Sequence, residues 1–66
     1  MKLTVNGEQK ELDDGTALQV LIDEMNLEGK RYAVEVNREI VPKRQHPEYV
    51  LKEGDVVEVV HAVGGG

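Results

Sequence analysis

The residues best suited to chemistry are the last three, Gly64-Gly65-Gly66, which carry the terminal carboxylate. They follow Val56 to Val63, a run dominated by β-branched residues that is typical of a strand. A glycine thread has no side chains to clash in a narrow channel, although ordering it is entropically costly. A carboxylate becomes an electrophile only after a good leaving group is attached. The pattern therefore favours a terminal carboxyl that another protein activates; the alternative is a frayed end or linker without function.

The rest of the chain offers little for catalysis. It contains no Cys and no Ser, so the usual thiol and hydroxyl nucleophiles are missing. The aliphatic hydroxyls are those of Thr4 and Thr16, and both have structural explanations. The imidazoles are those of His46 and His61. We expect both histidines to be non-catalytic residues at the surface or at an interface.

Size and charge restrict the class of protein. A chain of 66 residues forms one small domain. Its net charge of −5 and its two aromatic residues argue against nucleic-acid binding. We expect no membrane segment, because no apolar run approaches the ~20 residues that a span requires, and hence a soluble cytoplasmic protein. Asp13-Asp14 supplies too few oxygen ligands at the right spacing for Mg²⁺ or Ca²⁺, so we expect a solvated loop and no bound metal or cofactor.

The first twelve residues predict a hairpin. Leu3 and Val5 alternate with polar residues, as in a half-buried strand. Asn6-Gly7 tolerates the positive φ angles of a tight turn. The polar return strand, Glu8 to Leu12, is typical of a sheet edge.

The next segment predicts a helix. Leu18, Leu21, Ile22 and Met25 have the spacing of one apolar stripe, which we expect to face a sheet. Thr16 precedes the stripe, and its distance from Gln19 predicts a capping box at the helix start. Asn26 can end the helix in a left-handed conformation.

The second half predicts further strands. Tyr32 to Asn37 alternates again, and Pro42 ends the short apolar piece Ile40-Val41. We expect an irregular segment from Pro42 to Pro47, a cover over one end of the core from Tyr49-Val50-Leu51, and then the valine strand.

The economical arrangement of these elements is an α+β roll. We expect a β-grasp fold, with a mixed sheet of four to five strands and one main helix across one face. The first and last strands should lie side by side in its middle, because both are the most apolar. The domain would span residues 1–63, with residues 64–66 as a flexible tail.

Two groups of residues are candidates for a partner interface. If Val57 and Val59 face the helix, Val60 and Ala62 emerge on the uncovered face of the sheet. The alternative is that a central strand simply carries more valine. Lys43-Arg44 is a second candidate, although such pairs are usually only solvated charge.

From end to end, the chain resembles the ThiS family, the sulfur carriers of thiamine biosynthesis. The resemblance rests on the glycine end and four further motifs: Asn6-Gly7, Ala33-Val34-Glu35-Val36-Asn37, Ile40-Val41-Pro42, and Gly54-Asp55 before the valine strand. Many relatives place arginine directly after the proline, whereas this chain has Lys43 and then Arg44.

The resemblance implies a ubiquitin-like fold and a carrier role, not an enzyme. A ThiF-type enzyme would adenylate Gly66 with ATP, and Val63, Gly64 and Gly65 would lie in the partner's channel. Sulfur derived from cysteine through a desulfurase would then displace AMP and leave a thiocarboxylate on Gly66. Thiazole synthase, ThiG, would receive that sulfur for the thiazole ring.

Three alternatives remain open from the sequence. The small subunit of molybdopterin synthase uses the same chemistry on the same fold, but is usually longer. A ubiquitin-like modifier would form isopeptide bonds to lysines. A non-covalent β-grasp interaction module would have an irrelevant tail.

Overall fold

The computed structural model describes residues 1–61. The predicted tail, Ala62 to Gly66, and the predicted domain boundary after Val63 lie outside this range. The elements follow in the order β1 (Lys2–Val5), β2 (Glu8–Glu11), α1 (Leu18–Glu24), β3 (Tyr32–Val36), β4 (Glu39–Ile40), the 3₁₀ helix η1 (Lys43–Gln45) and β5 (Val56–His61).

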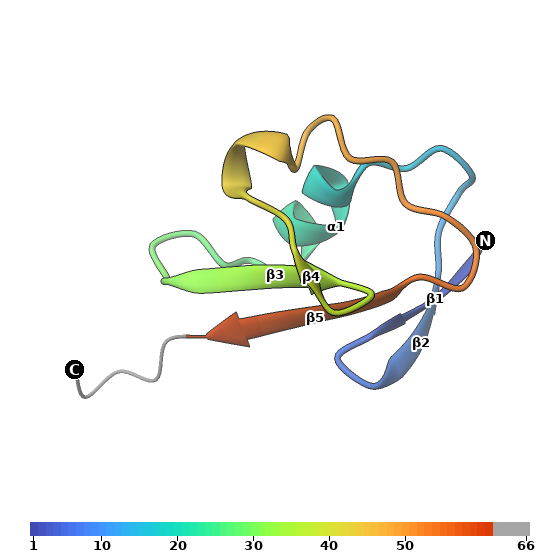
Figure 1. Cartoon of the computed structure of the whole chain (residues 1–66), viewed down its shortest axis with the longest axis horizontal. Helices are drawn as coiled ribbons and strands as arrows, with labels where there is room; N and C mark the ends of the chain where they lie inside the picture. The colour runs from blue at the N-terminus through green and yellow to red at the C-terminus, as the bar shows by residue number, and fades with distance from the viewer. Residues whose placement is uncertain (62–66) are drawn as a thin grey trace.

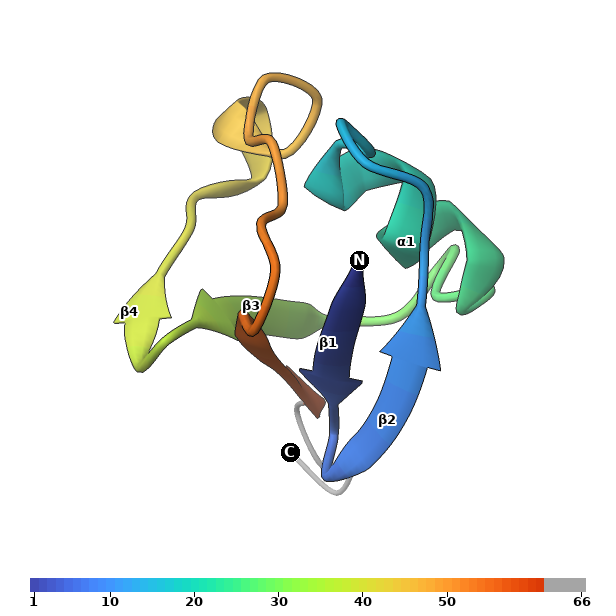
Figure 2. The same ribbon diagram turned by 90° about the vertical axis from the view of Figure 1, so that its right-hand side faces the viewer.

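The strands form one five-stranded mixed sheet in the order β2-β1-β5-β3-β4. The first and last strands lie side by side at its centre, as predicted, and the structure shows that they pair in parallel. The polar strand β2 forms one edge, also as predicted. All other pairings are antiparallel. Figure 1 shows α1 and the segment around η1 on one side of the sheet, and Figure 2 shows the sheet curving beneath them. The α+β roll with a β-grasp arrangement is confirmed.

Two tight turns set the strand registers. Asn6 and Gly7 have φ angles of 50° and 84°, so the first hairpin turns as predicted. Asn37 and Arg38 connect β3 to β4 with φ angles of 53° and 71°. An arginine in this left-handed region is unusual, because its Cβ crowds the backbone there.

The predicted capping box is wrong. Helix α1 begins at Leu18, and the Thr16 hydroxyl donates instead to the backbone carbonyl of Asp13, at 2.7 Å. The N–H groups that open the helix are satisfied from another segment: Leu18 donates to the carbonyl of Tyr49 and Gln19 to that of His46. Tertiary contacts thus replace the local cap. The predicted stop at Asn26 is confirmed by its φ angle of 56°.

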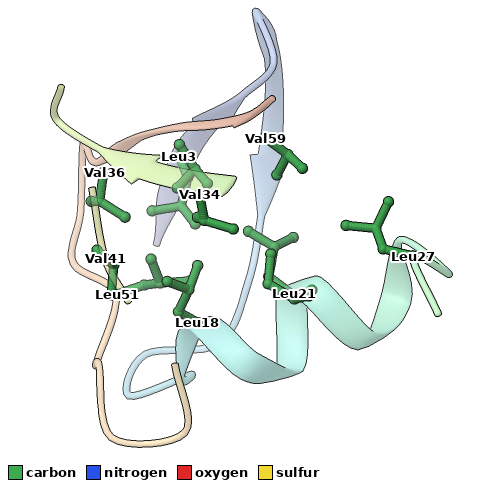
Figure 3. Close-up of a cluster of buried hydrophobic side chains, with 11 residues drawn as sticks. Leu3, Leu18, Leu21, Leu27, Val34, Val36, Val41, Leu51 and Val59 are labelled. Carbon is green, nitrogen blue, oxygen red and sulfur yellow. The ribbon is translucent and has the colours of Figure 1, made fainter. Parts of the chain in front are cut away.

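The core lies between α1 and the sheet (Figure 3). Leu18, Leu21 and Ile22 are buried from the helix, and Met25 is half-buried beside them, so the predicted stripe is confirmed. The other buried apolar side chains come from the strands and loops: Leu3, Leu27, Val34, Val36, Val41, Leu51, Val57 and Val59.

The prediction for the segment after Pro42 needs two corrections. His46 is not a surface residue: only 1% of it is exposed, and its Nε2 lies 2.9 Å from the carbonyl oxygen of Val41. The chain curls through η1 and turns the imidazole inward, where it fills volume beneath the loop. Leu51 covers the core as expected, but Val50 is 50% exposed because its backbone pairs with Ala17 at the surface.

Polar side chains fix the start of β5. Asp55 is nearly buried and accepts hydrogen bonds from the Asn37 side chain at 3.0 Å and from the Lys52 N–H at 2.9 Å. The Asn37 side chain in turn accepts a bond from the Val56 N–H. These three hydrogen bonds fix the position at which β5 begins.

Candidate functional site

The site of interest is the second half of β5, from which the chain continues toward its last residues. Strand β1 flanks β5 only as far as Val57, and then turns away at Asn6-Gly7. The Asn6 backbone N–H donates to the Val57 carbonyl, and the Asn6 side-chain oxygen accepts from the Val59 N–H at 2.8 Å. On its other side β5 pairs with β3 as far as His61, opposite Tyr32. The second half of β5 is therefore paired with β3 along one side, and on the other side it is bonded by the Asn6 side chain.

The uncovered face of the sheet carries an apolar group, as the sequence predicts. Val57 and Val59 face the helix and are buried, whereas Val60 is 52% exposed on the opposite face. Val60 lies opposite Ala33 of β3, which is also exposed. Ile40 of β4 and Val56 of β5 share this face, with 68% and 41% exposure. The second predicted residue of the patch, Ala62, lies outside the described residues.

Two acidic residues interrupt this apolar group. Glu35 of β3 lies directly opposite Glu58 of β5, and both side chains point to the uncovered face. Like charges in this position destabilise a sheet. The opposition of these two carboxylates depends on the register between β3 and β5, which leaves no signal in the sequence.

A shallow hollow of about 300 Å³ lies at the end of β5. Its lining combines the end of β5 with the start of β3: Arg31, Tyr32, Ala33, Val60 and His61. Only Val60 of this set was predicted as a site residue. Apolar, aromatic and cationic groups together give a surface suited to a protein partner.

The basic pair predicted as a docking element lies in η1. Lys43 Nζ sits 4.6 Å from the centre of the Tyr32 ring, a cation–π contact, and Arg44 is exposed. Tyr32 belongs to the helix-facing set of β3, whereas Val60 lies on the other face. Lys43 and Val60 therefore approach the end of β5 from opposite sides of the sheet.

The phenol of Tyr49 has a raised pKa. Burial raises the pKa of Tyr49 above its ordinary value of 10.0, and the carboxylates of Asp55 and Glu39 raise it further. This group lies away from the end of β5, so its effect is on stability.

Within residues 1–61, no group of three His, Asp or Glu residues is arranged to hold a metal ion. No helix in the same range is long and apolar enough to cross a membrane. The predicted modification site, Gly66, and the predicted channel residues Val63, Gly64 and Gly65 lie beyond the described range.

Comparison with known proteins identifies the family. The ThiS family model matches residues 3–66. The chain belongs to the ThiS family. A solved structure of the thiamine biosynthesis protein ThiS from Geobacter metallireducens superimposes with a TM-score of 0.82 at 29% identity, covering all of both chains.

Some proteins similar to this chain are close to it in length, and others are several times longer. The sulfur carrier protein ThiS of Thermus thermophilus is 40% identical over 94% of this chain and 95% of its own length. The sulfur carrier protein ThiS of Bacillus subtilis is 46% identical over 82% and 80%. A thiazole synthase of Paramagnetospirillum magneticum is 36% identical over the whole chain, which spans only 20% of that protein.

Proposed function

We propose that this chain is a sulfur carrier for thiazole formation in thiamine biosynthesis and that its working group is the carboxyl of Gly66. A ThiF-type partner supplies ATP; the carboxylate attacks the α-phosphorus, pyrophosphate leaves, and an acyl adenylate forms. A sulfur nucleophile, derived from cysteine through a desulfurase, then attacks the carbonyl carbon and expels AMP. Because the donor is a persulfide, this step forms an acyl disulfide. A thiol then attacks the donor's sulfur, forms a disulfide with the donor and releases the thiocarboxylate.

The observation that carries this proposal is the match to sulfur carriers along almost the whole chain. The match covers 94% of this chain and 95% of the Thermus thermophilus sulfur carrier, so it includes nearly every residue of that carrier. The composition supports a passive role in the chemistry, because the sequence has no Cys or Ser with which to perform the activation itself.

The thiazole synthase relatives support thiazole synthase, ThiG, as the recipient of the sulfur. In these proteins a region similar to this entire chain forms about a fifth of a longer protein. A carrier and a synthase joined in one polypeptide keep the sulfur donor close to its acceptor at high effective concentration.

The surface around the end of β5 supports docking on these partners. Val60 and Ala62 would form the apolar part of the contact and Lys43 and Arg44 its basic part, so that Val63, Gly64 and Gly65 enter the partner's channel. Glycines suit this passage because they present no Cβ to its walls. Contacts made by the domain would offset the roughly 1–2 kcal/mol that ordering each tail residue costs.

Intact-mass spectrometry tests the proposal. The chain is incubated with a ThiF-type enzyme, ATP and a sulfur donor, and the expected product has one terminal oxygen replaced by sulfur. A chain ending at Val63, which lacks all three terminal glycines, is the control and should remain unmodified. Absence of any mass change in the wild-type chain, with an enzyme shown to modify another ThiS protein, would refute the proposal. Linkage to lysines of other proteins would instead indicate a ubiquitin-like modifier.

A further inference from the structure

The side of β5 that β1 leaves exposes backbone hydrogen-bonding groups. Alternate residues of β5 face β1: Asp55 and Val57 accept bonds from Thr4 and Asn6, and Val59 donates to the Asn6 side chain. The intervening residues face β3, as the bond from Asn37 to the Val56 carbonyl shows. By this alternation the Val59 carbonyl and both backbone groups of His61 point to the vacated side. Within residues 1–61, no strand pairs with them there.

A pocket adjoins this exposed edge. It has a volume of about 300 Å³ and is lined in part by Asn6, the residue that bonds Val59. Val5, Leu21 and Met25 supply its apolar lining. Its charged lining residues are Glu8, Lys10 and Glu24, and Lys10 pairs with Glu24 at 3.4 Å. Strand addition to a sheet edge takes affinity from backbone bonds and specificity from pockets for alternate side chains. Both features occur here, beside the hairpin turn.

We propose that an extended segment of the activating partner pairs with β5 along this vacated edge. Its backbone bonds to Val59 and His61, and one of its apolar side chains enters the pocket above Met25. The inserted strand lies beside the second half of β5, as β1 lies beside its first half. It thereby fixes the direction in which the chain beyond β5 enters the partner. This inference rests on the proposed function, since the partner is the enzyme that modifies Gly66.

Amide exchange tests the backbone contact without any substitution. In the free chain, the N–H of His61 should exchange with solvent faster than that of Val59, which is bonded to Asn6. Saturating ThiF-type enzyme should slow exchange at His61 by about 10-fold or more. The two methionines provide an internal comparison, because a methyl-labelled sample should show a shifted Met25 resonance and an unchanged Met1 resonance.

A matched pair of variants tests the same contact by rate. His61→Pro removes the outward N–H without removing a bond to β3, and His61→Ala keeps the N–H while removing the imidazole. The proline variant should be modified about 2- to 10-fold more slowly than the alanine variant, the range expected for one backbone hydrogen bond. Thermal unfolding of the two should coincide.

The outcomes separate this inference from the function on which it rests. If the wild-type chain gains no sulfur, the carrier function fails and the inference with it. If the wild-type chain gains sulfur normally while His61 exchange is unchanged and the two variants react at equal rates, the carrier function stands and strand pairing is overturned.

Discussion

The side-chain oxygen of Asn6 accepts a hydrogen bond from the backbone N–H of Val59, which lies 53 positions later in the chain. This bond extends the pairing of β1 with β5 by one step after β1 has turned away. The residue that makes the hairpin turn is thus also the last support on that side of β5. Its conformation and its side chain have separable roles.

Substitutions of Asn6 should separate these two roles. Asn6→Gly keeps the positive φ angle but removes the acceptor, and should lower the free energy of unfolding by about 1 kcal/mol. Asn6→Ala also loses the short polar side chain that lets asparagine adopt the left-handed region, and should cost a further 1 kcal/mol or so. Urea denaturation of the two variants measures the difference. Equal losses would show that the turn conformation carries no penalty here.

Truncation of His46 should be among the most damaging single changes in the domain. His46→Ala leaves a cavity and an unpaired Val41 carbonyl, and should lower the free energy of unfolding by about 2–4 kcal/mol. His46→Leu refills the volume but not the hydrogen bond, so its loss should be smaller. The exposed His61 serves as control, and its replacement by alanine should change stability by less than about 0.5 kcal/mol.

Stability should fall at alkaline pH because of Tyr49. Its pKa is raised in the folded state by burial and by Asp55 and Glu39, so above about pH 10 the unfolded chain loses the phenolic proton first. The folded state then binds more protons than the unfolded state, and stability decreases as pH rises toward the folded pKa. Well below pH 10 the Tyr49 phenol is protonated in both the folded and the unfolded state, so it adds no pH dependence to the free energy of unfolding. Urea midpoints from pH 8 to 11 should drop more steeply for the wild-type chain than for Tyr49→Phe; parallel curves would contradict this assignment.

Neutralising one member of the Glu35–Glu58 pair should stabilise the sheet. Glu35→Gln and Glu58→Gln should each raise the free energy of unfolding by about 0.2–1 kcal/mol, because each removes the same repulsion across the strands. The double variant should therefore gain little beyond either single variant. Thermal unfolding at low and high salt provides the check, since the gain should shrink as salt screens the charges. A gain that is additive and independent of salt would argue against repulsion as its cause.

Two equally exposed valines provide a test of the docking face. Val60→Asp places a charge in the apolar group at the end of β5, and should slow sulfur loading by about 10-fold or more if partners contact this face. Val20, on the outer side of α1, is 48% exposed compared with 52% for Val60. Val20→Asp is the matched control and should load at the wild-type rate. Similar rates for the two variants, measured by intact mass, would exclude this part of the sheet from the contact.

The sequence predicts the fold where local chemistry and periodicity decide the outcome. Asn6-Gly7 turns the chain at the expected place, and the apolar spacing of α1 identifies its buried side. Where distant segments compete with local ones, the prediction fails. Thr16 has the spacing of a capping residue, but carbonyls of the loop near Tyr49 already satisfy the helix start.

Some features of the candidate site could likewise be predicted from the sequence, and others could not. The exposure of Val60 follows from alternation along a single strand, so the sequence could predict it. The burial of His46 and the opposition of Glu35 to Glu58 depend on how the chain curls after Pro42 and on the register of two strands. Neither leaves a signal in a single sequence. The backbone groups exposed beside Asn6 likewise become visible only once β1 is seen to end before β5.

The last strand is also the structural centre of the sheet, with a neighbour on each side and Val57 and Val59 in the core. A chain broken before Val56 would therefore lose the middle of its sheet, not merely its reactive end. Such a fragment could not fold into a domain that occupies a partner's docking surface without a carboxyl to deliver. The architecture thus excludes one class of inert competitor: a chain cut before β5 does not fold, so only the loss of residues after β5 leaves a recognisable domain without a carboxyl to deliver.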